Sequence, residues 1–209
     1  MGDTNRRTLA TYNSAPDAYI ENSPQKVEGY LQQWIDAVFT GIPKNTAILE
    51  IGSGGGRDAV YIENELGFTN VLRSDASPEF VERLRDEGHD AALVDALQPI
   101  GSKEQFGVVF ADAVLLHFDD EELPVVLGNI YECLENGGEL YFTTAKPAAG
   151  QKAAGWSDRK LGSERYFNRL DEQSLRAALA NAGFSATDTV VQSDTSDKWF
   201  HVATRKVAV

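Results

Sequence analysis

Cysteine and basic residues are scarce in this sequence, and each scarcity excludes a class of protein. A single Cys among 209 residues excludes an intramolecular disulfide and any cysteine-rich zinc site, so we expect no metal and a reducing, cytoplasmic environment. Lys and Arg number 19 against 32 Asp and Glu, which gives a net charge of -13. Because that charge repels phosphate backbones, a nucleic acid is an unlikely partner.

Long apolar runs are absent as well. No stretch approaches the roughly 20 apolar residues of a membrane span. The first residues, MGDTNRRTLATYNSAP, contain no apolar signal core, so we expect no membrane partner. The single Cys133 lies in NIYECLE at helical spacing from Ile130, which favours core packing over a role as nucleophile or ligand.

What the sequence does contain is a regular alternation of strand-length apolar segments and helical patterns. Ser23 as cap and Pro24 as first residue predict a helix over 23–39. Strands are then predicted at 47–51, 70–74, 91–94, 106–112 and 139–145, with helices at 57–66, 77–88 and 120–135. Short strands separated by helices are typical of a parallel α/β sheet that is wound on both faces.

The last third of the sequence follows a different pattern. After a helix at 171–184, strands at 186–194 and 198–207 are joined by only a few turn residues. Such a short connection makes a hairpin, so the final strand should run antiparallel to its neighbour. The one long irregular stretch, 146–167, has the length of a lid or binding loop.

A glycine-rich loop follows the first predicted strand, in ILEIGSGGGRDA. Gly52, Gly54 and Gly56 can form a tight turn and allow a ligand to approach the backbone closely. A dinucleotide loop needs a third Gly where Arg57 stands, and the Gly-Lys-Ser/Thr of a triphosphate loop is missing. Glu50 adds negative charge nearby, so a cationic ligand without phosphate is the better prediction.

Two acids at later strand ends complete a pattern. Asp75 follows the second strand, where a carboxylate can accept both hydroxyls of a ribose. Asp95 follows the third strand, where it can reach the edge of an adenine. Each acid alone could simply be a turn or cap residue, but the ordered series after the glycine loop indicates a nucleoside site.

These segments together resemble the class I S-adenosylmethionine-dependent methyltransferases. LEIGSGGGRDA is similar to their first motif, LRSDASPEFVERLR to their ribose-binding segment and VDAL to their adenine segment, while FGVVFADAVLLHF and LENGGELYFTTAK resemble their fourth and fifth strands. The pieces AYIENSPQKV and KLGSERYF are similar to a small bacterial branch without an added domain.

The resemblance implies a Rossmann-like, doubly wound, seven-stranded sheet whose last strand is antiparallel, with an N-terminal helical cap. It implies one domain over 1–209, divided into the cap (1–44), a cofactor-binding half (45–145) and an acceptor loop, helix and hairpin (146–209). The residues predicted in this way to hold S-adenosylmethionine are Glu50, Gly52, Ser53, Gly54, Arg57, Asp75, Ala76, Asp95, Ala96, Ala111 and Asp112.

The expected reaction is an in-line displacement of the cofactor's methyl group onto a small-molecule or peptide acceptor. Since the sulfonium is already a good leaving group, the protein mainly aligns the acceptor and excludes water. His117 is the candidate catalytic base, although a strand-capping residue bonded to backbone is the simpler interpretation.

The acceptor-binding residues should come from the segments outside the sheet. A cationic and aromatic group in the late stretch suggests an anchor for an acidic acceptor, and two N-terminal tyrosines could close over the site. The candidates are Tyr12, Tyr19, Lys146, Trp156, Arg159, Lys160, Arg165 and Tyr166. Two alternatives stay open: a module that binds the cofactor without turnover, and a nicotinamide-dependent reductase.

Overall fold

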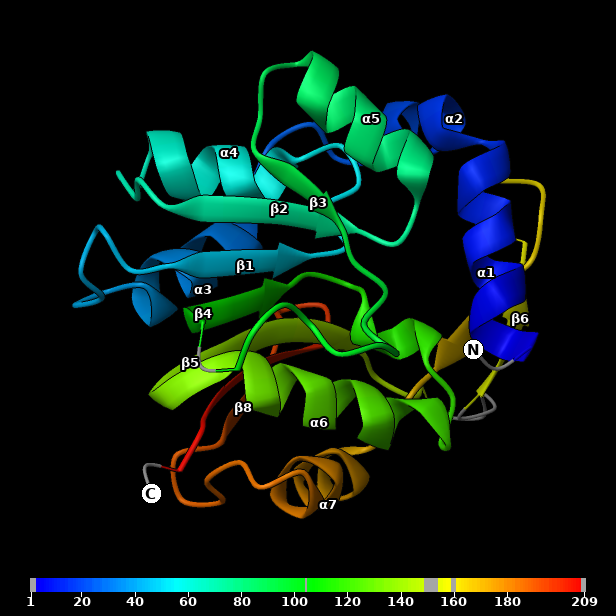
Figure 1. The fold of residues 1–209 in the computed structure, drawn as a ribbon. Helices are drawn as coiled ribbons and strands as arrows, with labels where there is room; N and C mark the ends of the chain where they lie inside the picture. Colours follow the sequence, from blue (N-terminus) through cyan, green and yellow to red (C-terminus); the bar gives the residue numbers. More distant parts are fainter. Residues whose placement is uncertain (1–2, 104, 149–153, 159–160, 208–209) are drawn as a thin grey trace.

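The computed structural model describes residues 3–103, 105–148, 154–158 and 161–207, and its centre is a seven-stranded sheet in the order β3-β2-β1-β4-β5-β9-β8 (Figure 1). The pairings from β3 through β5 are parallel, whereas β9 pairs antiparallel with both β5 and β8. The predicted Rossmann-like sheet with an antiparallel last strand is therefore confirmed. The strands are β1 (Ile48–Ile51), β2 (Val71–Asp75), β3 (Ala91–Leu93), β4 (Phe106–Ala111), β5 (Leu134–Ala145), β8 (Val190–Ser193) and β9 (Trp199–Arg205).

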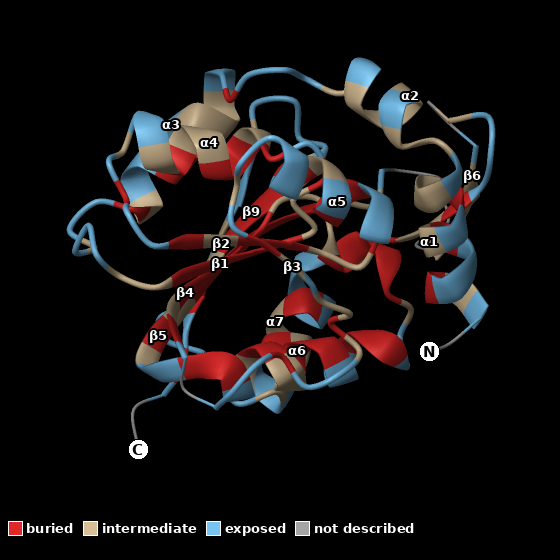
Figure 2. Cartoon of the chain, turned by 45° about the horizontal axis from the view of Figure 1, so that its top comes forward, coloured by how far each residue is buried: buried red, intermediate tan, exposed pale blue. Residues whose placement is uncertain are grey.

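Helices cover both faces of the sheet, as the doubly wound pattern predicts. Figure 1 shows α4 and α5 on one side and α6 and α7 on the other. Apolar residues of α3 pack with those of α4 on the first side. Figure 2 shows that the buried residues lie along the strands and on the helix faces turned toward them. These helices are α3 (Gly29–Val38), α4 (Arg57–Asn64), α5 (Pro78–Asp86), α6 (Glu122–Cys133) and α7 (Glu172–Asn181).

Alternation along the central strands divides the core into two layers. Ile48 of β1 and Val108 of β4 pack toward α3 and α4, whereas Leu49 and Val109 pack toward α6 and α7. This is the period of two that a strand imposes on its side chains. Cys133 is 1% exposed in the second layer, which confirms its predicted role in packing. No helix within the described ranges is long and apolar enough to cross a membrane.

Two N-terminal helices, α1 (Asp3–Ser14) and α2 (Pro16–Glu21), were not predicted individually. In Figure 1, α1 lies across the carboxyl ends of the central strands. The buried residues of α1 are Asn5, Thr8 and Thr11, so its inward face carries no apolar periodicity that the sequence could reveal.

The helix predicted over 23–39 begins only at Gly29, and Ser23 does not cap it. The Ser23 hydroxyl instead donates to the carbonyl of Tyr19 at 2.7 Å, at the end of α2. The residues between α2 and α3 thus form an irregular connection, although a Ser-Pro pair is a common helix start.

Part of the late irregular stretch forms a second, two-stranded antiparallel sheet of β6 (Ala154–Ser157) and β7 (Arg165–Asn168). It is joined to the N-terminus, because the Tyr166 amide donates to the Thr8 hydroxyl at 3.0 Å and the Thr11 hydroxyl donates to the Glu164 carbonyl at 2.7 Å. Segments more than 150 positions apart therefore form one cap over the sheet edge.

Candidate active site

The sheet order reverses between β1 and β4, and this position determines where a ligand can bind. The strands β1 and β4 are neighbours in the sheet although β2 and β3 separate them in the chain. In open α/β sheets, ligands bind outside the carboxyl ends of strands at such a switch point. The glycine loop leaves β1 at this edge, and the short 3-10 helix Leu115–His117 follows β4 there.

The loop requires glycine at two positions that face this edge. Gly52 and Gly54 have φ angles of 71° and 51°, in the left-handed region that side chains disfavour. A Cβ atom on Gly52 would overlap a methyl group of Val114, and one on Gly54 would lie 3.1 Å from the Tyr19 ring. Glycine is therefore needed at both positions, because it allows the positive φ angle and leaves room for the neighbouring side chain.

Asp75 holds the loop from the end of β2. Its Oδ2 accepts a hydrogen bond from the Gly54 amide at 3.0 Å, and its Oδ1 accepts one from the Ser77 amide at 2.9 Å. Burial raises the pKa of Asp75, against the lowering effect of these backbone donors. Since a carboxylate has about four acceptor positions, both oxygens can still accept from a ligand.

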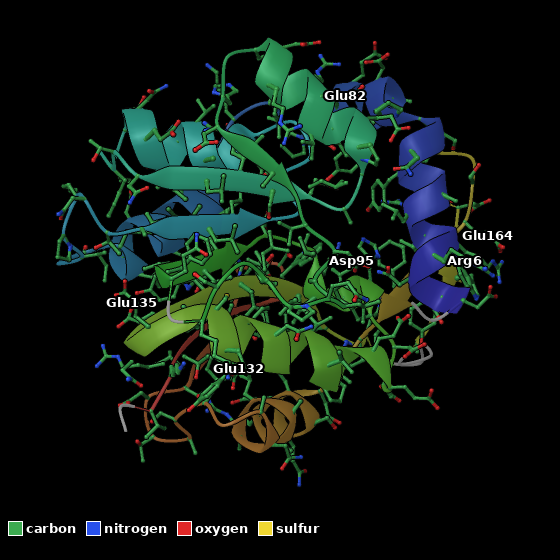
Figure 3. The ribbon with its side chains drawn as sticks, viewed as in Figure 1. Arg6, Glu82, Asp95, Glu132, Glu135 and Glu164 are labelled. Atoms are coloured by element: carbon green, nitrogen blue, oxygen red, sulfur yellow. The ribbon has the colours of Figure 1, made fainter. Side chains whose placement is uncertain are left out.

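A cavity of about 90 Å³, here called the smaller cavity, lies between the sheet edge and α1. Figure 3 shows Asp95 on the part of the chain that faces α1. The cavity brings together ten of the residues predicted from the sequence: Tyr12, Tyr19, Gly52, Gly54, Asp75, Ala76, Asp95, Ala96, Asp112 and His117.

The roof of the smaller cavity is a chain of hydrogen bonds around His117. The His117 Nδ1 donates to the carbonyl of Tyr166 at 2.6 Å, since a carbonyl can only accept. Its Nε2 therefore accepts from the Tyr12 hydroxyl at 2.9 Å, and that hydroxyl accepts from Arg165 Nη1 at 3.0 Å. Burial lowers the pKa of His117 to about 4, so the ring is neutral at pH 7.

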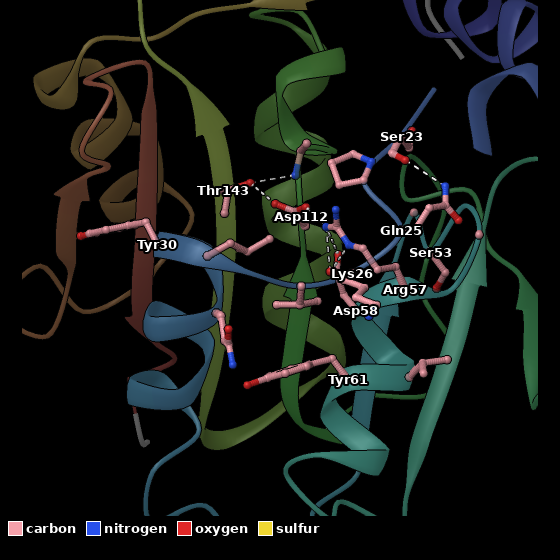
Figure 4. Close-up of a pocket in the computed structure, with 18 of the residues that line it drawn as sticks. Ser23, Gln25, Lys26, Tyr30, Ser53, Arg57, Asp58, Tyr61, Asp112 and Thr143 are labelled. Carbon is pink, nitrogen blue, oxygen red and sulfur yellow. Dashed lines mark hydrogen bonds and ion pairs between the residues drawn. The ribbon is translucent and has the colours of Figure 1, made fainter. Parts of the chain in front are cut away.

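A second cavity of about 1000 Å³, here called the larger cavity, opens on the other side of the glycine loop (Figure 4). Arg57 lies in its wall with Nε 2.7 Å from Asp58 Oδ1 and Nη2 2.8 Å from Asp112 Oδ2. Asp112 also accepts from the Thr143 hydroxyl. Burial, together with the neighbouring Asp112 charge, raises the pKa of Asp58 to about 6. The predicted site residues Ser53 and Arg57 line this cavity and not the smaller one.

The two cavities meet at one place. Tyr19, Gly52, Asp112 and Ala113 line both of them. This junction lies at the switch point, between the loop after β1 and the residues after β4. A group held in the smaller cavity would therefore be within reach of a molecule in the larger one.

Two predicted cofactor residues lie away from both cavities. Glu50 is 2% exposed beneath the loop, where its Oε1 accepts from the Ala59 amide at 3.1 Å near the start of α4. Ala111 is fully buried in the layer toward α6. Because side chains alternate along a strand, an acid before the loop can face the helix rather than the ligand edge.

The late cationic and aromatic residues that the structure describes also lie outside the two cavities. The Lys146 ammonium pairs with Asp197 at the turn between β8 and β9. The Trp156 ring lies beneath the Arg7 guanidinium, 3.8 Å from ring centre to Cζ. None of the described residues of 146–168 lines either cavity. Two further candidates lie outside the part of the chain that the structure describes: Arg159 and Lys160.

Several cavity residues were not predicted. Thr143 of β5 and His201 of β9 are cross-strand partners that both line the larger cavity, together with Tyr30 of α3. Polar residues within the apolar strands YFTTA and WFHVA were an available signal. Asn5 and Thr8 of α1 line the smaller cavity and carry no comparable signal.

Comparisons with known proteins agree with this arrangement. The family model described as a methyltransferase domain matches residues 24–189. The chain is 29% identical over 167 residues to the protein-lysine N-methyltransferase EFM3 of Chaetomium thermophilum, a match that covers 72% of this chain and 44% of that protein. The chain thus spans less than half the length of this curated relative.

Solved structures share the fold at low sequence identity. The 4+2 cyclase SpnF has a TM-score of 0.74 at 17% identity, with 99% of this chain and 97% of that chain covered. Phosphoethanolamine N-methyltransferase 2 of Haemonchus contortus, bound to S-adenosylhomocysteine, has a TM-score of 0.71 at 16% identity, with 99% and 61% covered. The 1,6-didemethyltoxoflavin-N1-methyltransferase of Burkholderia thailandensis has a TM-score of 0.67 at 14% identity, with 97% and 87% covered.

The family match extends over most of the chain and includes the glycine loop, both strand-end acids and the residues of the junction after β4. It gives no support to the alternative of a nicotinamide-dependent reductase. The chain belongs to the class I S-adenosylmethionine-dependent methyltransferases, with S-adenosylmethionine as its cofactor.

Proposed function

We propose that this protein binds S-adenosylmethionine in the smaller cavity and transfers its methyl group to an acceptor in the larger cavity. The observation that carries this proposal is the junction, where Tyr19, Gly52, Asp112 and Ala113 line both cavities. A donor and an acceptor bound on the two sides of the junction would meet where these four residues surround it, as an in-line displacement requires.

The chemistry of the smaller cavity suits this cofactor. The free acceptor positions of Asp75 suit ribose hydroxyls, and the backbone at Gly54 has no side chain that would fill the space beside it. When bound, the cofactor supplies an electrophilic methyl group on a sulfonium. Asp112 contributes negative charge at the junction, which favours a positively charged group there.

The cap must move for the cofactor to enter. A volume of about 90 Å³ is well below the roughly 300 to 1000 Å³ of most small-molecule sites. The Tyr12 and Tyr19 rings, 5.2 Å apart between centroids, occupy the side of the cavity toward α1. Their displacement would admit the ligand, and their return would exclude water from the reacting groups.

His117 fits a structural role in the cap better than the role of a base. Both of its ring nitrogens have hydrogen-bond partners, and its lowered pKa makes it a weak proton acceptor. Likewise, the buried Arg165 guanidinium contacts Tyr12 and lines neither of the two cavities, so we do not assign it to an acidic acceptor. The residues that we assign to the acceptor are those of the larger cavity.

The test of the cofactor site is the substitution Asp75→Ala. Losing two charge-assisted hydrogen bonds to the ribose should weaken S-adenosylmethionine binding by about 2 to 4 kcal/mol, measured by calorimetry. Asp75→Asn keeps one oxygen for the Gly54 amide but loses the negative charge, so it separates the effect of the charge from that of the side chain's size. Glu82→Gln, on the exposed surface of α5, is the control. An unchanged dissociation constant for both Asp75 variants would remove this residue from the site.

Turnover is tested separately, by release of S-adenosylhomocysteine with a panel of small molecules and peptides. Release with any acceptor supports the proposed reaction. Tight cofactor binding without release across amines, carboxylates and hydroxyl compounds would favour a binding module instead.

A further inference from the structure

The lining of the larger cavity has a distinctive charge. Among the described residues that line it, four carry carboxylates and two carry cationic groups: Asp58, Glu65, Asp112 and Asp194 against Lys26 and Arg57. The Arg57 guanidinium is already engaged by Asp58 through two hydrogen bonds and by Asp112 through a third. Lys26 is exposed. Glu65 is exposed as well, so these two charges offset each other, and the lining carries two more carboxylates than cationic groups, which favours a positively charged ligand.

Aromatic rings occupy the same cavity. Tyr19, Tyr30, Tyr61 and Trp199 line it, and the Tyr30 ring packs edge-on against His201 with centroids 4.8 Å apart. Ring faces together with carboxylates are the groups that recognise an organic ammonium, by cation–π attraction and charge-assisted hydrogen bonds.

His201 gives a second, independent indication of a polar ligand. It lines the cavity, is only 5% exposed, and its Nδ1 has no hydrogen-bond partner among the described residues. Buried polar atoms of this kind are usually satisfied, by the protein, by water or by a ligand. His201 lies opposite Thr143 in the β5–β9 pairing, and the Thr143 hydroxyl donates to Asp112 at the junction.

From these observations we propose that the larger cavity binds the methyl acceptor through a basic nitrogen, an amine that is an ammonium in water. The proposal rests on the proposed function. The ammonium first loses a proton to water. The nitrogen lone pair then forms the new N–C bond while the electrons of the C–S bond pass to sulfur, and the product amine keeps its positive charge or releases a further proton.

The experiment measures binding to protein saturated with S-adenosylhomocysteine, so that no probe is turned over. Three probes of similar size differ in their terminal group: phenethylamine, 3-phenylpropionate and 2-phenylethanol. We expect the amine to bind at least about tenfold more tightly than the other two, by calorimetry, because it gains charge-assisted contacts that they lack.

Two variants connect this preference to the cavity. Asp112→Asn should lower amine affinity about tenfold, and Tyr30→Leu about fivefold, with little change for the alcohol. Tyr30 lines only the larger cavity, so Tyr30→Leu still tests the proposal if Asp112→Asn disturbs the fold. Glu82→Gln removes one surface carboxylate and should leave all three affinities unchanged.

A fourth probe separates two sources of the amine. An acetylated and amidated Gly-Gly-Lys-Gly-Gly peptide that binds more tightly than phenethylamine assigns the site to lysine side chains, and weaker binding assigns it to free small amines. Absent or weaker binding of both amines, relative to the carboxylate or alcohol, would overturn the proposal. Failure to bind S-adenosylhomocysteine would instead contradict the proposed function, so the two failures are distinguishable.

Discussion

Glu50 is a buried acid whose protonation should make the stability of the folded protein depend on pH. Burial, with the nearby Asp58 charge, raises the pKa of Glu50 from 4.5 to about 8. Between those two values the folded protein keeps a proton that the unfolded chain has released. The contribution of Glu50 to stability is therefore present at low pH and is lost as the pH rises toward 8.

We predict that Glu50→Gln reduces this loss, because the amide mimics the protonated carboxyl at every pH. Relative to the parent protein, the variant should gain up to about 2 to 3 kcal/mol in free energy of unfolding between pH 5 and pH 7. Urea unfolding at both pH values measures the change, with Glu82→Gln as control. Equal pH dependence in the variant and the parent would show that Glu50 is ionised in the folded state.

At the scale of elements, the glycine loop joins β1 and α4 to the cap. Gly54 has a φ of 51°, and a Cβ atom on it would lie 3.1 Å from the Tyr19 ring. Any side chain there therefore strains the backbone and enters the space beside the tyrosine. Gly67 has a comparable φ of 76°, but a Cβ atom on it would meet no atoms within 4 Å.

We therefore predict that Gly54→Val abolishes S-adenosylmethionine binding, while Gly67→Val lowers stability without changing cofactor affinity. The pair separates backbone strain from blockage of the site. Calorimetry measures affinity and thermal unfolding measures stability. Normal binding by Gly54→Val would mean that the loop acts only as a turn.

The cap is a second element whose behaviour can be tested. Arg165 of β7 holds the Tyr12 hydroxyl of α1, and Tyr12 holds His117. Arg165→Ala should loosen this connection and speed cofactor dissociation several-fold, with affinity falling no more than about tenfold. Stopped-flow displacement of the cofactor measures the rate.

Arg176→Ala is the control for loss of an arginine, because the half-exposed Arg176 of α7 bonds to Glu172 and to the Thr189 carbonyl and lies outside the cap. Arg165→Ala could instead leave the dissociation rate unchanged and raise only the Michaelis constant of an acidic acceptor. Arg165 would then bind the acceptor, as predicted from the sequence, and would not hold the cap.

At the scale of the whole molecule, cofactor binding should stabilise the fold by mass action. S-adenosylmethionine at 100 times its dissociation constant should raise the free energy of unfolding by about 2.7 kcal/mol and the melting temperature by about 5 to 10 °C. Asp75→Ala at the same cofactor concentration should show a much smaller shift. A shift with NAD and none with S-adenosylmethionine would contradict the cofactor assignment.

The amino-acid pattern was enough to predict the sheet, its antiparallel last strand and much of the cofactor site. Apolar periodicity reports which face of a strand or helix is buried, and a positive φ requires glycine at particular loop positions. Acids directly after parallel strands lie at the edge of the sheet where ligands bind. Gly52, Gly54, Asp75 and Asp95 were all predicted from such local signals, and they line one cavity.

The remaining features could not be predicted from the sequence, because they depend on contacts between distant segments. The inward face of α1 is polar, so no local sequence pattern predicts its contacts with β7. These contacts are the hydrogen bonds of Thr8 with Tyr166 and of Tyr12 with Arg165. The direction of the Glu50 side chain depends on which face of β1 meets α4, and the larger cavity arises where α3, α4 and β9 converge. Hydrogen bonds between segments so far apart in the chain produce no periodic pattern in the sequence. They form only when the elements that carry them pack against each other.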